Sequence, residues 1–409
     1  MPCILLVAQN IGHAQKWIHL GLEPFRFSWI SLSMGFKRTR FLRTSFLTLV
    51  VLVGLNLSAC RNNQVGPIEA IDTTVQFVSR GLQGFSVYSI RESKKYIYAC
   101  TQRDGLFRIL KSDLGSGYWE YLGLKTNALG THGVLDVAVF GDNDDLILAG
   151  IGNDKEGFPG LLRSTDQGLT WIASDSNLVG GYTGIPSLTQ IHSATYFAVS
   201  PITPGLIFTC NWWNSAVFWT HDYGADWSRT ANTSLDGYFI GIIETEPQRP
   251  ERVWAAGWLQ RSTDSGVSWL FVNTYSDNFP VHVITSMVFG NIGEVYISQL
   301  DRVVRSTDDG STWSMFLKAD STVTITSVLV DPKCVDHVLV SGETLTRNPK
   351  GVLLSKQTIL YEFAGGSLKR VHVCDGVIIS NRLRVLDDGR LFFGTDEDGI
   401  QEVTNLLKP

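Results

Sequence analysis

The chain has 409 residues, 18% of them charged, and a formal net charge of −5. The charge is unevenly distributed, because from residue 60 onward the chain carries 28 Lys and Arg against 38 Asp and Glu, a net charge of −10. An acidic exterior repels nucleic acid and anionic lipid, so the composition argues against a protein that binds either of them through its charge.

Residues 34–59 have the order of a secretory signal peptide. Four basic residues between Lys37 and Arg43 precede an apolar run, Ser45 to Leu57, that is too short to span a bilayer comfortably. The run closes with LSAC at residues 57–60, which resembles a bacterial lipobox with Cys60 as the lipidated residue. We therefore expect a bacterial envelope protein held at the outer membrane or cell surface by a lipid on Cys60. An ordinary cleaved signal and an N-terminal membrane helix are the alternatives.

The charged head of this signal follows Met34, which predicts that residues 1–33 are a spurious N-terminal extension. Residues 60–73 then comprise the lipidated Cys60 and a polar linker. The remainder, residues 74–409, is expected to form a single domain.

From residue 74 the chain alternates short apolar stretches with turn residues, and no segment has the periodicity of a long amphipathic helix. Seven segments share one pattern: an apolar strand, a turn rich in Asp, Pro or Gly, and a second strand that ends in small residues. They are residues 86–100, 134–150, 193–210, 238–257, 284–299, 325–342 and 381–395. Strand repeats with a period of roughly 40–60 residues predict four-stranded sheets stacked into a β-propeller.

We predict an all-β fold, a single seven-bladed propeller of four-stranded antiparallel blades, with a six-bladed ring as the alternative. The last segment is followed by one further strand, within residues 394–403, so the seventh blade lacks an outer strand. Residues 74–82, TVQFVSRGL, precede the first segment and can supply that strand. The ring is therefore expected to close by pairing the N-terminal strand into the last blade.

One phrase recurs between the expected third and fourth strands of several blades. It reads RSTDQGLTW at 163–171, RSTDSGVSW at 261–269 and RSTDDGSTW at 305–313, with a fourth copy, THDYGADW, at 220–227. We expect its Asp to accept hydrogen bonds from its own turn, its Gly to adopt a positive φ, and its Trp to pack under the blade. The residues concerned are Asp166, Gly168, Trp171, Asp222, Gly224, Trp227, Asp264, Gly266, Trp269, Asp308, Gly310 and Trp313.

These copies resemble the Asp-box, or bacterial neuraminidase repeat, family over residues 74–403. That family contains sialidases, and sortilin-like and photosystem II assembly factor-like propellers carry similar boxes. The resemblance implies that the box is a structural hairpin on the face opposite the ligand-binding face, with no catalytic residue in it. A slipped copy at residues 112–119 and a vestige at residues 354–361 are expected in the first and sixth blades.

The loops on the face opposite the boxes are rich in aromatic and polar residues. Clustered aromatic side chains with polar neighbours suit stacking on sugars or a protein hot spot, although a Trp of this cluster can also simply plug the channel. We expect a monomeric, non-enzymatic module that binds a polysaccharide or an envelope protein through this face. The candidate ligand-binding residues are Trp212, Trp213, Trp258, Asn211, Tyr182, His192 and Asp154.

A glycoside hydrolase of the exo-sialidase type is the alternative. FRIL at residues 107–110 resembles a sialidase motif whose Arg holds the substrate carboxylate, but Arg108 occupies the same repeat position as Arg163 and Arg261, which favours a repeat feature. Glu244 and Glu246 are candidate carboxylates, but both are expected at an inner hairpin on the wrong face.

No metal or cofactor is predicted. Beyond Cys60, the exported chain has Cys100, Cys210, Cys334 and Cys374, with no CxxC motif and no His at the spacing of metal ligands. Disulfides are permitted in an exported protein, and the pair Cys334 with Cys374 is the more plausible one.

Overall fold

The fold is known from a computed structural model. It describes residues 75–125, 131–153, 159–175, 178, 196–211, 216–230, 241–256, 259–272, 284–347, 353–364, 366–375, 383–404 and 406.

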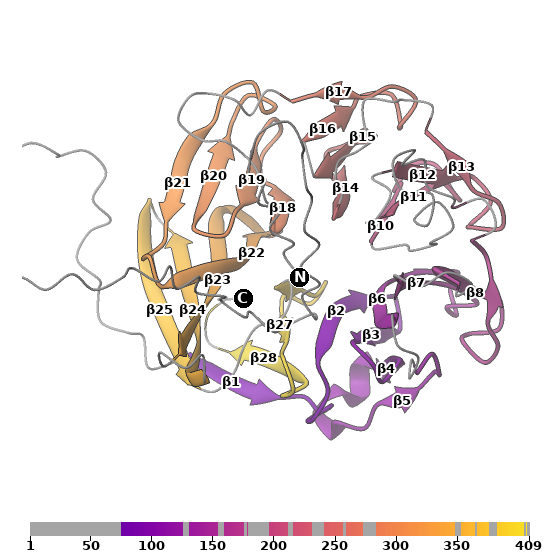
Figure 1. Cartoon of the computed structure of the whole chain (residues 1–409), viewed down its shortest axis with the longest axis horizontal. Helices are drawn as coiled ribbons and strands as arrows, with labels where there is room; N and C mark the ends of the chain where they lie inside the picture. Colours follow the sequence, from indigo (N-terminus) through magenta and orange to yellow (C-terminus); the bar gives the residue numbers. More distant parts are fainter. Residues whose placement is uncertain are drawn as a thin grey trace, which may run out of the picture.

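Seven four-stranded antiparallel sheets are arranged in a ring (Figure 1), which confirms the predicted seven-bladed β-propeller. Blade 1 consists of β2–β5, blade 2 of β6–β9, blade 3 of β10–β13, blade 4 of β14–β17, blade 5 of β18–β21 and blade 6 of β22–β25; blade 7 combines β26–β28 with β1. The strands are β1 (Gln76–Ser79), β2 (Val87–Glu92), β3 (Tyr96–Thr101), β4 (Leu106–Leu110), β5 (Glu120–Tyr121), β6 (Thr131–Phe140), β7 (Leu146–Asn153), β8 (Leu161–Ser164), β9 (Ile172–Ala173), β10 (Phe197–Val199), β11 (Ile207–Asn211), β12 (Ala216–Thr220), β13 (Ser228–Arg229), β14 (Ile242–Glu246), β15 (Arg249–Ala256), β16 (Gln260–Ser262), β17 (Leu270–Phe271), β18 (Ser286–Phe289), β19 (Val295–Ser298), β20 (Arg302–Ser306), β21 (Ser314–Lys318), β22 (Val323–Asp331), β23 (Cys334–Arg347), β24 (Leu353–Ala364), β25 (Ser367–Asp375), β26 (Arg384–Val385), β27 (Leu391–Gly394) and β28 (Ile400–Thr404).

The ring closes between the two ends of the chain, as predicted. In blade 7 the order of strands is β1-β28-β27-β26, and β1 pairs antiparallel with β28 from Gln76 opposite Thr404 to Ser79 opposite Gln401. The seventh blade therefore takes its outer strand from the N-terminal part of the chain.

The hydrophobic core lies mainly between neighbouring blades. Val87 and Ile90 of β2 share one cluster with Leu386 and Phe392 of blade 7. The second strand of a blade is covered on both faces, so β3 reads YIYACT with every residue after the first buried. A sheet that buries both faces against its neighbours explains why these strands are apolar throughout rather than alternating.

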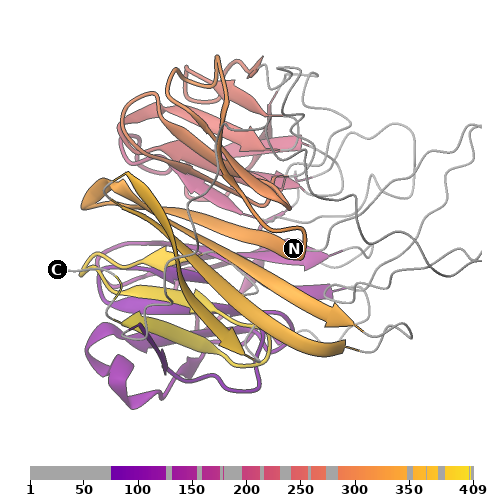
Figure 2. The same ribbon diagram turned by 90° about the vertical axis from the view of Figure 1, so that its left-hand side faces the viewer.

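Each blade is a simple antiparallel meander, so its turns fall at two ends. The turn between the first and second strands and the turn between the third and fourth strands share one end, which we call the hairpin end. The turn between the second and third strands lies at the other end, which we call the opposite end. Blade 6 has the longest strands, 14 residues in β23 and 12 in β24, and Figure 2 shows them in orange and yellow across the width of the ring.

The recurrent phrase forms a hairpin between the third and fourth strands in blades 2 to 5, at the hairpin end; we call these the repeat hairpins. In the first of them the Ser164 hydroxyl donates to Asp166 Oδ1 over 2.7 Å and accepts from the backbone N–H of Gly168 over 2.8 Å. Thr170 donates its hydroxyl to Asp166 Oδ2 and its N–H to Asp166 Oδ1. These bonds, those from Thr170 foremost, lower the pKa of Asp166 to about 2, so the carboxylate is a fully engaged acceptor of its own turn.

The repeat hairpins also fasten each blade to the one before it. A Cβ at Gly168 would contact Leu122 of blade 1, and a Cβ at Gly310 would contact Trp254 of blade 4, so the glycines lie against the preceding blade. The residue before each of these glycines, for example Gln167, is also at positive φ. At three of the four hairpins its carbonyl accepts a hydrogen bond from an arginine of the preceding blade: from Arg108 Nη1 to Gln167 O (2.9 Å), from Arg163 Nε to Tyr223 O (3.2 Å) and from Arg261 Nη1 to Asp309 O (2.6 Å).

Blades 1 and 6 depart from the expected repeat. The slipped copy in blade 1 contains a 3-10 helix, η1 (Lys111–Ser116), between β4 and β5. The expected vestige at residues 354–361 is wrong, because these residues lie inside the long strand β24 and the turn of that blade follows Ala364. Within the described part of the chain, no helix has the length and apolar character needed to cross a membrane.

The disulfide between Cys334 and Cys374 is excluded by the strand register. Cys374 is opposite Thr358, and Thr358 is opposite Glu343, which lies nine residues along β23 from Cys334. At about 3.3 Å per residue this separates the two cysteines by roughly 30 Å, whereas disulfide-bonded Cα atoms lie within about 7 Å. Cys334 is a free, exposed cysteine, and Cys100 and Cys210 are free and buried.

The substitution Gly266→Ala tests the packing of a repeat hairpin on the preceding blade. Gly266 has a φ of +84°, and its Cβ would overlap the ring of Phe208 in blade 3. We expect a loss of about 1–2 kcal/mol from backbone strain and about 1–3 kcal/mol more from overpacking, measured as a lower midpoint of urea unfolding. Gly84→Ala, at φ +85° with nothing within 4 Å, should show the strain alone, and Gly115→Ala, in open space without a positive φ, should show neither. Equal losses for Gly266→Ala and Gly84→Ala would contradict the packing role.

Candidate functional site

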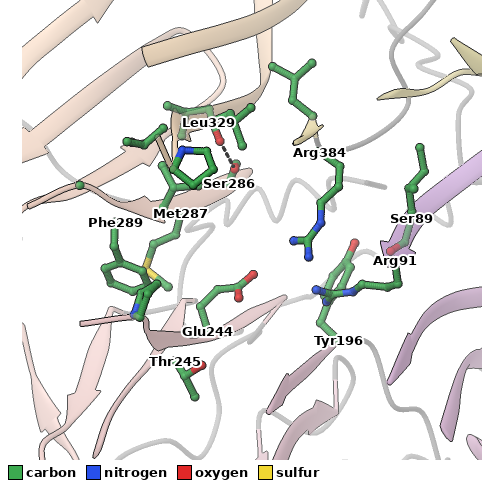
Figure 3. Close-up of a pocket in the computed structure, with 18 of the residues that line it drawn as sticks. Ser89, Arg91, Tyr196, Glu244, Thr245, Ser286, Met287, Phe289, Leu329 and Arg384 are labelled. Atoms are coloured by element: carbon green, nitrogen blue, oxygen red, sulfur yellow. Dashed lines mark hydrogen bonds between the residues drawn. The ribbon is translucent and has the colours of Figure 1, made fainter. Parts of the chain in front are cut away.

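A cavity of about 340 Å³ occupies the central channel of the ring (Figure 3). The first strands of blades 1, 4, 5 and 6 line it, together with Tyr196 beside β10 and Leu383 and Arg384 of blade 7. Its lining runs from residues where the inner strands begin, such as Ser286, to hairpin-end turns at Gln248 and Pro332. The cavity therefore extends along the channel and is enclosed by most of the blades.

An ion pair anchors one wall of the cavity. Arg91 of β2 donates to both oxygens of Asp136 in β6, from Nε over 2.7 Å and from Nη2 over 2.5 Å. Asp136 is fully buried and also accepts hydrogen bonds from the Ser89 hydroxyl, at 2.9 Å, and from the backbone N–H of Phe197, at 3.1 Å. One carboxylate thus joins the inner strands of blades 1, 2 and 3, and with its oxygens saturated it is poorly placed to act as an acid or a base.

Two further charges face the cavity, Arg384 from β26 and Glu244 from β14. Figure 3 shows the guanidinium of Arg384 and the carboxylate of Glu244 directed into the same hollow, with Arg91 and Tyr196 beside them. Burial, and secondly the nearby charge of Arg91, lower the pKa of Arg384. The lining also contains hydroxyl groups, on Ser89, Thr245 and Ser286, and apolar side chains of Met287 and Phe289.

The repeat hairpins take no part in the cavity lining. Their acidic residues, Asp166, Asp222, Asp264 and Asp308, all accept hydrogen bonds within their own turns. Arg108, the arginine of the sialidase-like FRIL, lies on the third strand of blade 1 and is bonded to Glu120 at 2.6 Å and to the carbonyl of Gln167. It therefore serves the contact between blades 1 and 2, as its repeat position indicated.

Most of the predicted ligand-binding residues lie outside the described residues: Trp212, Trp213, Trp258, Tyr182, His192 and Asp154. Asn211 is the last residue of β11, where its backbone pairs with Ala216. By the meander order, the turn after β11 belongs to the opposite end of blade 3. Cys60 also lies outside the described residues.

Sequence reasoning missed the cavity charges. Arg91, Asp136 and Arg384 were not singled out, and Glu244 was set aside as an inner-hairpin residue, whereas it lines the cavity. Glu246, its companion, is buried and paired with Arg249 over 2.5 Å. A signal was present: each of these charges interrupts an otherwise apolar innermost strand, as in SIRE, LDVAV, IIETE and RLRVL. A charge in such a strand must face the channel or a partner.

Among the described residues, no group of three or more His, Cys, Asp or Glu side chains is arranged to hold a metal ion.

Comparison with known proteins supports the fold. No protein-family model matches the chain, and no curated protein is similar to it in sequence. Among solved structures, the GH74 xyloglucanase from Xanthomonas campestris is similar with a TM-score of 0.56 and 16% identity, over 82% of this chain and 55% of the xyloglucanase. The extracellular domain of a hybrid two component system from B. thetaiotaomicron is similar with a TM-score of 0.55 and 12% identity, over 81% of this chain and 40% of that domain.

A third similar structure, YCF48 from Cyanidioschyzon merolae, has a TM-score of 0.53 and 13% identity, over 80% of this chain and 98% of YCF48. This chain thus spans about half of the first two proteins and the whole of the third. At these identities the similarity establishes the propeller fold and leaves the activity open, since the three proteins include a hydrolase and proteins of other kinds.

The substitution Asp136→Ala tests the ion pair behind the cavity wall. It leaves Arg91 largely buried without its carboxylate, so we expect a loss of about 3–5 kcal/mol in the free energy of unfolding, measured by urea titration. The matched control is Asp142→Ala, which removes an ion pair with Lys94 between side chains that are 83% and 77% exposed and should change stability little. Similar effects of the two substitutions would show that the Asp136 pair does not anchor the wall.

Proposed function

We propose that the protein is an exported, lipid-anchored, non-enzymatic β-propeller that binds a polysaccharide or another envelope protein through the face opposite the repeat hairpins. The observation that carries the proposal is a difference between the two ends of the ring: at the hairpin end, the polar groups of the repeat hairpins are already engaged in hydrogen bonds. The repeat hairpins use their polar groups within their own turns and against the preceding blade. The channel and the opposite end are left for recognition.

The assignment of the repeats to the Asp-box family belongs to this proposal. Its support is that the Ser or Thr, the Asp, the Gly and the Trp of the phrase form the same hairpin in four blades, as that family's structural box does. The similarity to an extracellular bacterial domain and to YCF48 is in keeping with an exported binding propeller.

A non-enzymatic role is favoured by the carboxylates of the described cavity. Most glycoside hydrolases use two carboxyl groups that flank the scissile bond. Within the described lining Glu244 is the single carboxylate, and Asp136 behind it is saturated by Arg91, Ser89 and a backbone N–H.

A glycoside hydrolase of the exo-sialidase type is the second candidate. The observation in its favour is that Tyr196 and Glu244 face the same hollow, because sialidases use a Tyr nucleophile, which the family resemblance pairs with a Glu partner. The similarity of the fold to a GH74 xyloglucanase is also compatible with a hydrolase.

The binding function is tested with the full-length protein on an array of polysaccharides and in pull-downs with envelope proteins. We expect the triple substitution Trp212→Ala, Trp213→Ala, Trp258→Ala to weaken binding about tenfold or more, because stacked aromatic side chains dominate such contacts. The control is Trp119→Ala, at the periphery of blade 1, where Trp119 donates to the carbonyl of Arg80. Unchanged binding by the triple variant would remove the proposed surface. If the wild-type protein hydrolysed fluorogenic sialosides or plant glucans, and if Glu244→Gln abolished this activity, the protein would be a hydrolase and the proposed non-enzymatic function would be wrong.

The lipid anchor is tested by the substitution Cys60→Ala. We expect it to move the protein from the membrane fraction to the soluble fraction, because the proposal places the whole attachment of this acidic chain on the lipid of Cys60. Immunoblots of fractionated cells report the distribution, with Cys334→Ala, at a free exposed cysteine, as the control. A Cys60→Ala protein that stays with the membrane would contradict lipidation at this residue.

A further inference from the structure

Five successive blades, 1 to 5, each expose a large apolar side chain in a turn of the hairpin end. These residues, which we call the apolar tips, are between 59% and 87% exposed: Tyr118, Leu169, Ile202, Val267 and Ile292. Each lies between the first and second or between the third and fourth strands of its blade. The apolar tips therefore share one side of the ring, which is the left side in Figure 2.

The fold of the repeat hairpins does not require apolar tips. Leu169 and Val267 occupy the same position of the repeated phrase, after its Gly, and Ala225 and Ser311 occupy it in the other two hairpins. In all four hairpins the N–H of the Gly donates to the hydroxyl of the preceding Ser or Thr, so a small or polar residue serves the turn equally well. A single exposed apolar residue is ordinary on a protein surface, so it is their common side that calls for an explanation.

In blades 2 and 4 the exposed apolar surface continues from the tip onto the outer strand. Ile172 of β9 follows Leu169 by three residues and is also exposed, and Leu270 and Phe271 of β17 follow Val267 in the same way. These are small, separate patches carried on different blades. A rigid protein partner would need a matching pocket for each patch, whereas a lipid surface deforms around every one of them.

The segment that would carry the lipid enters the ring at the same end. Gln76, the first residue of β1, is opposite Thr404, the last residue of β28. Since β28 is the third strand of its blade, it ends at the hairpin end, and β1 begins there. The 15 residues from Cys60 to Thr74 span at most about 50 Å. A lipid on Cys60 would therefore bring the hairpin end closest to the bilayer.

We propose that the hairpin end rests on the lipid bilayer and that the apolar tips insert into its headgroup region. This inference rests on the proposed lipid anchor: the lipid supplies the attachment, and the tips set the orientation of the ring, with the opposite end facing away from the membrane. Because the chain from residue 60 onward is acidic, the contact is apolar and suits zwitterionic lipids. Tyr118 fits this depth, since Tyr is enriched at the boundary between water and lipid.

The carboxylates next to the tips are compatible with this contact. Asp166 and Asp264 accept hydrogen bonds within their own turns, which reduces the water that they need. At the depth of the headgroups they would also face the choline or ammonium groups of zwitterionic lipids, which carry the opposite charge.

The test uses the lipidated protein, purified from membranes and reconstituted into phosphatidylcholine vesicles, with an environment-sensitive fluorophore on one cysteine. Val267→Cys carries the label at an apolar tip. The matched control, Arg103→Cys, carries it at an exposed position of the opposite end, between β3 and β4. Both variants also contain Cys334→Ser and Cys374→Ser, so that the label reacts at the intended position.

We expect the emission of the label at residue 267 to shift to shorter wavelength. Lipids with a nitroxide on the acyl chain should quench it about threefold or more than the label at residue 103. Replacing two other tips, Leu169→Ser with Ile292→Ser, should reduce the quenching at residue 267 by about half, because less apolar surface holds this end on the bilayer. Ser311→Leu, which adds a tip at the corresponding position of blade 5, should increase it.

Equal quenching at residues 267 and 103, in protein that floats with the vesicles, would overturn this inference and leave the lipid anchor standing. Protein that does not float with the vesicles would overturn both. A shift at residue 267 without quenching by the nitroxide lipids would mean that protein, such as a second copy of this chain, covers the tips, and the membrane contact would be wrong.

Discussion

When β1 pairs with β28, seven stacked sheets become a ring. Stacked sheets bury their faces against neighbours, but an open stack leaves two end blades with an exposed apolar face each. The cluster that joins Val87 and Ile90 of blade 1 to Phe392 of blade 7 is the interface that an open stack would expose. Closure also fixes the channel, because seven inner strands held at set positions around an axis leave a hollow between them. The cavity is thus a geometric consequence of the strand pairing at the periphery.

The contacts between blades differ between the periphery and the centre. At the periphery the repeat hairpins use the same few residues again and again: a hydroxyl that organises the turn, a glycine that fits against the preceding blade, and an arginine that donates to a carbonyl. At the centre the contacts are individual. Asp136 binds Arg91, Ser89 and Phe197, and no other described blade repeats that arrangement. Repetition suits stability, which every blade needs equally, whereas the central contacts occur once and so do not serve every blade alike.

This division explains how far the sequence could predict the structure. The hairpin formed by the phrase with Asp166, Gly168 and Trp171 could be predicted because its interactions are local: the acceptor, the donors and the positive-φ glycine lie within a few residues of one another. The closing strand could be predicted because the seventh blade had one strand fewer than the others. The partner of Arg91 could not be predicted, because Asp136 lies 45 residues from Arg91 and belongs to another blade. Residues 354–361 were misread because isolated Ser and Thr in a long β24 resemble the remains of a turn.

The arginines of the ring differ in the partners that the fold provides for them. Arg108 and Arg261 donate to backbone carbonyls of the next blade, and Arg91 binds both oxygens of a buried carboxylate. Arg384 lies on the inner strand β26, and its Nε has no acceptor in the described part of the chain. If its role were to join blades, a backbone carbonyl acceptor like those of Arg108, Arg163 and Arg261 would be expected. Arg384 therefore does not join blades in the way that Arg108 and Arg261 do, although its Nε is buried.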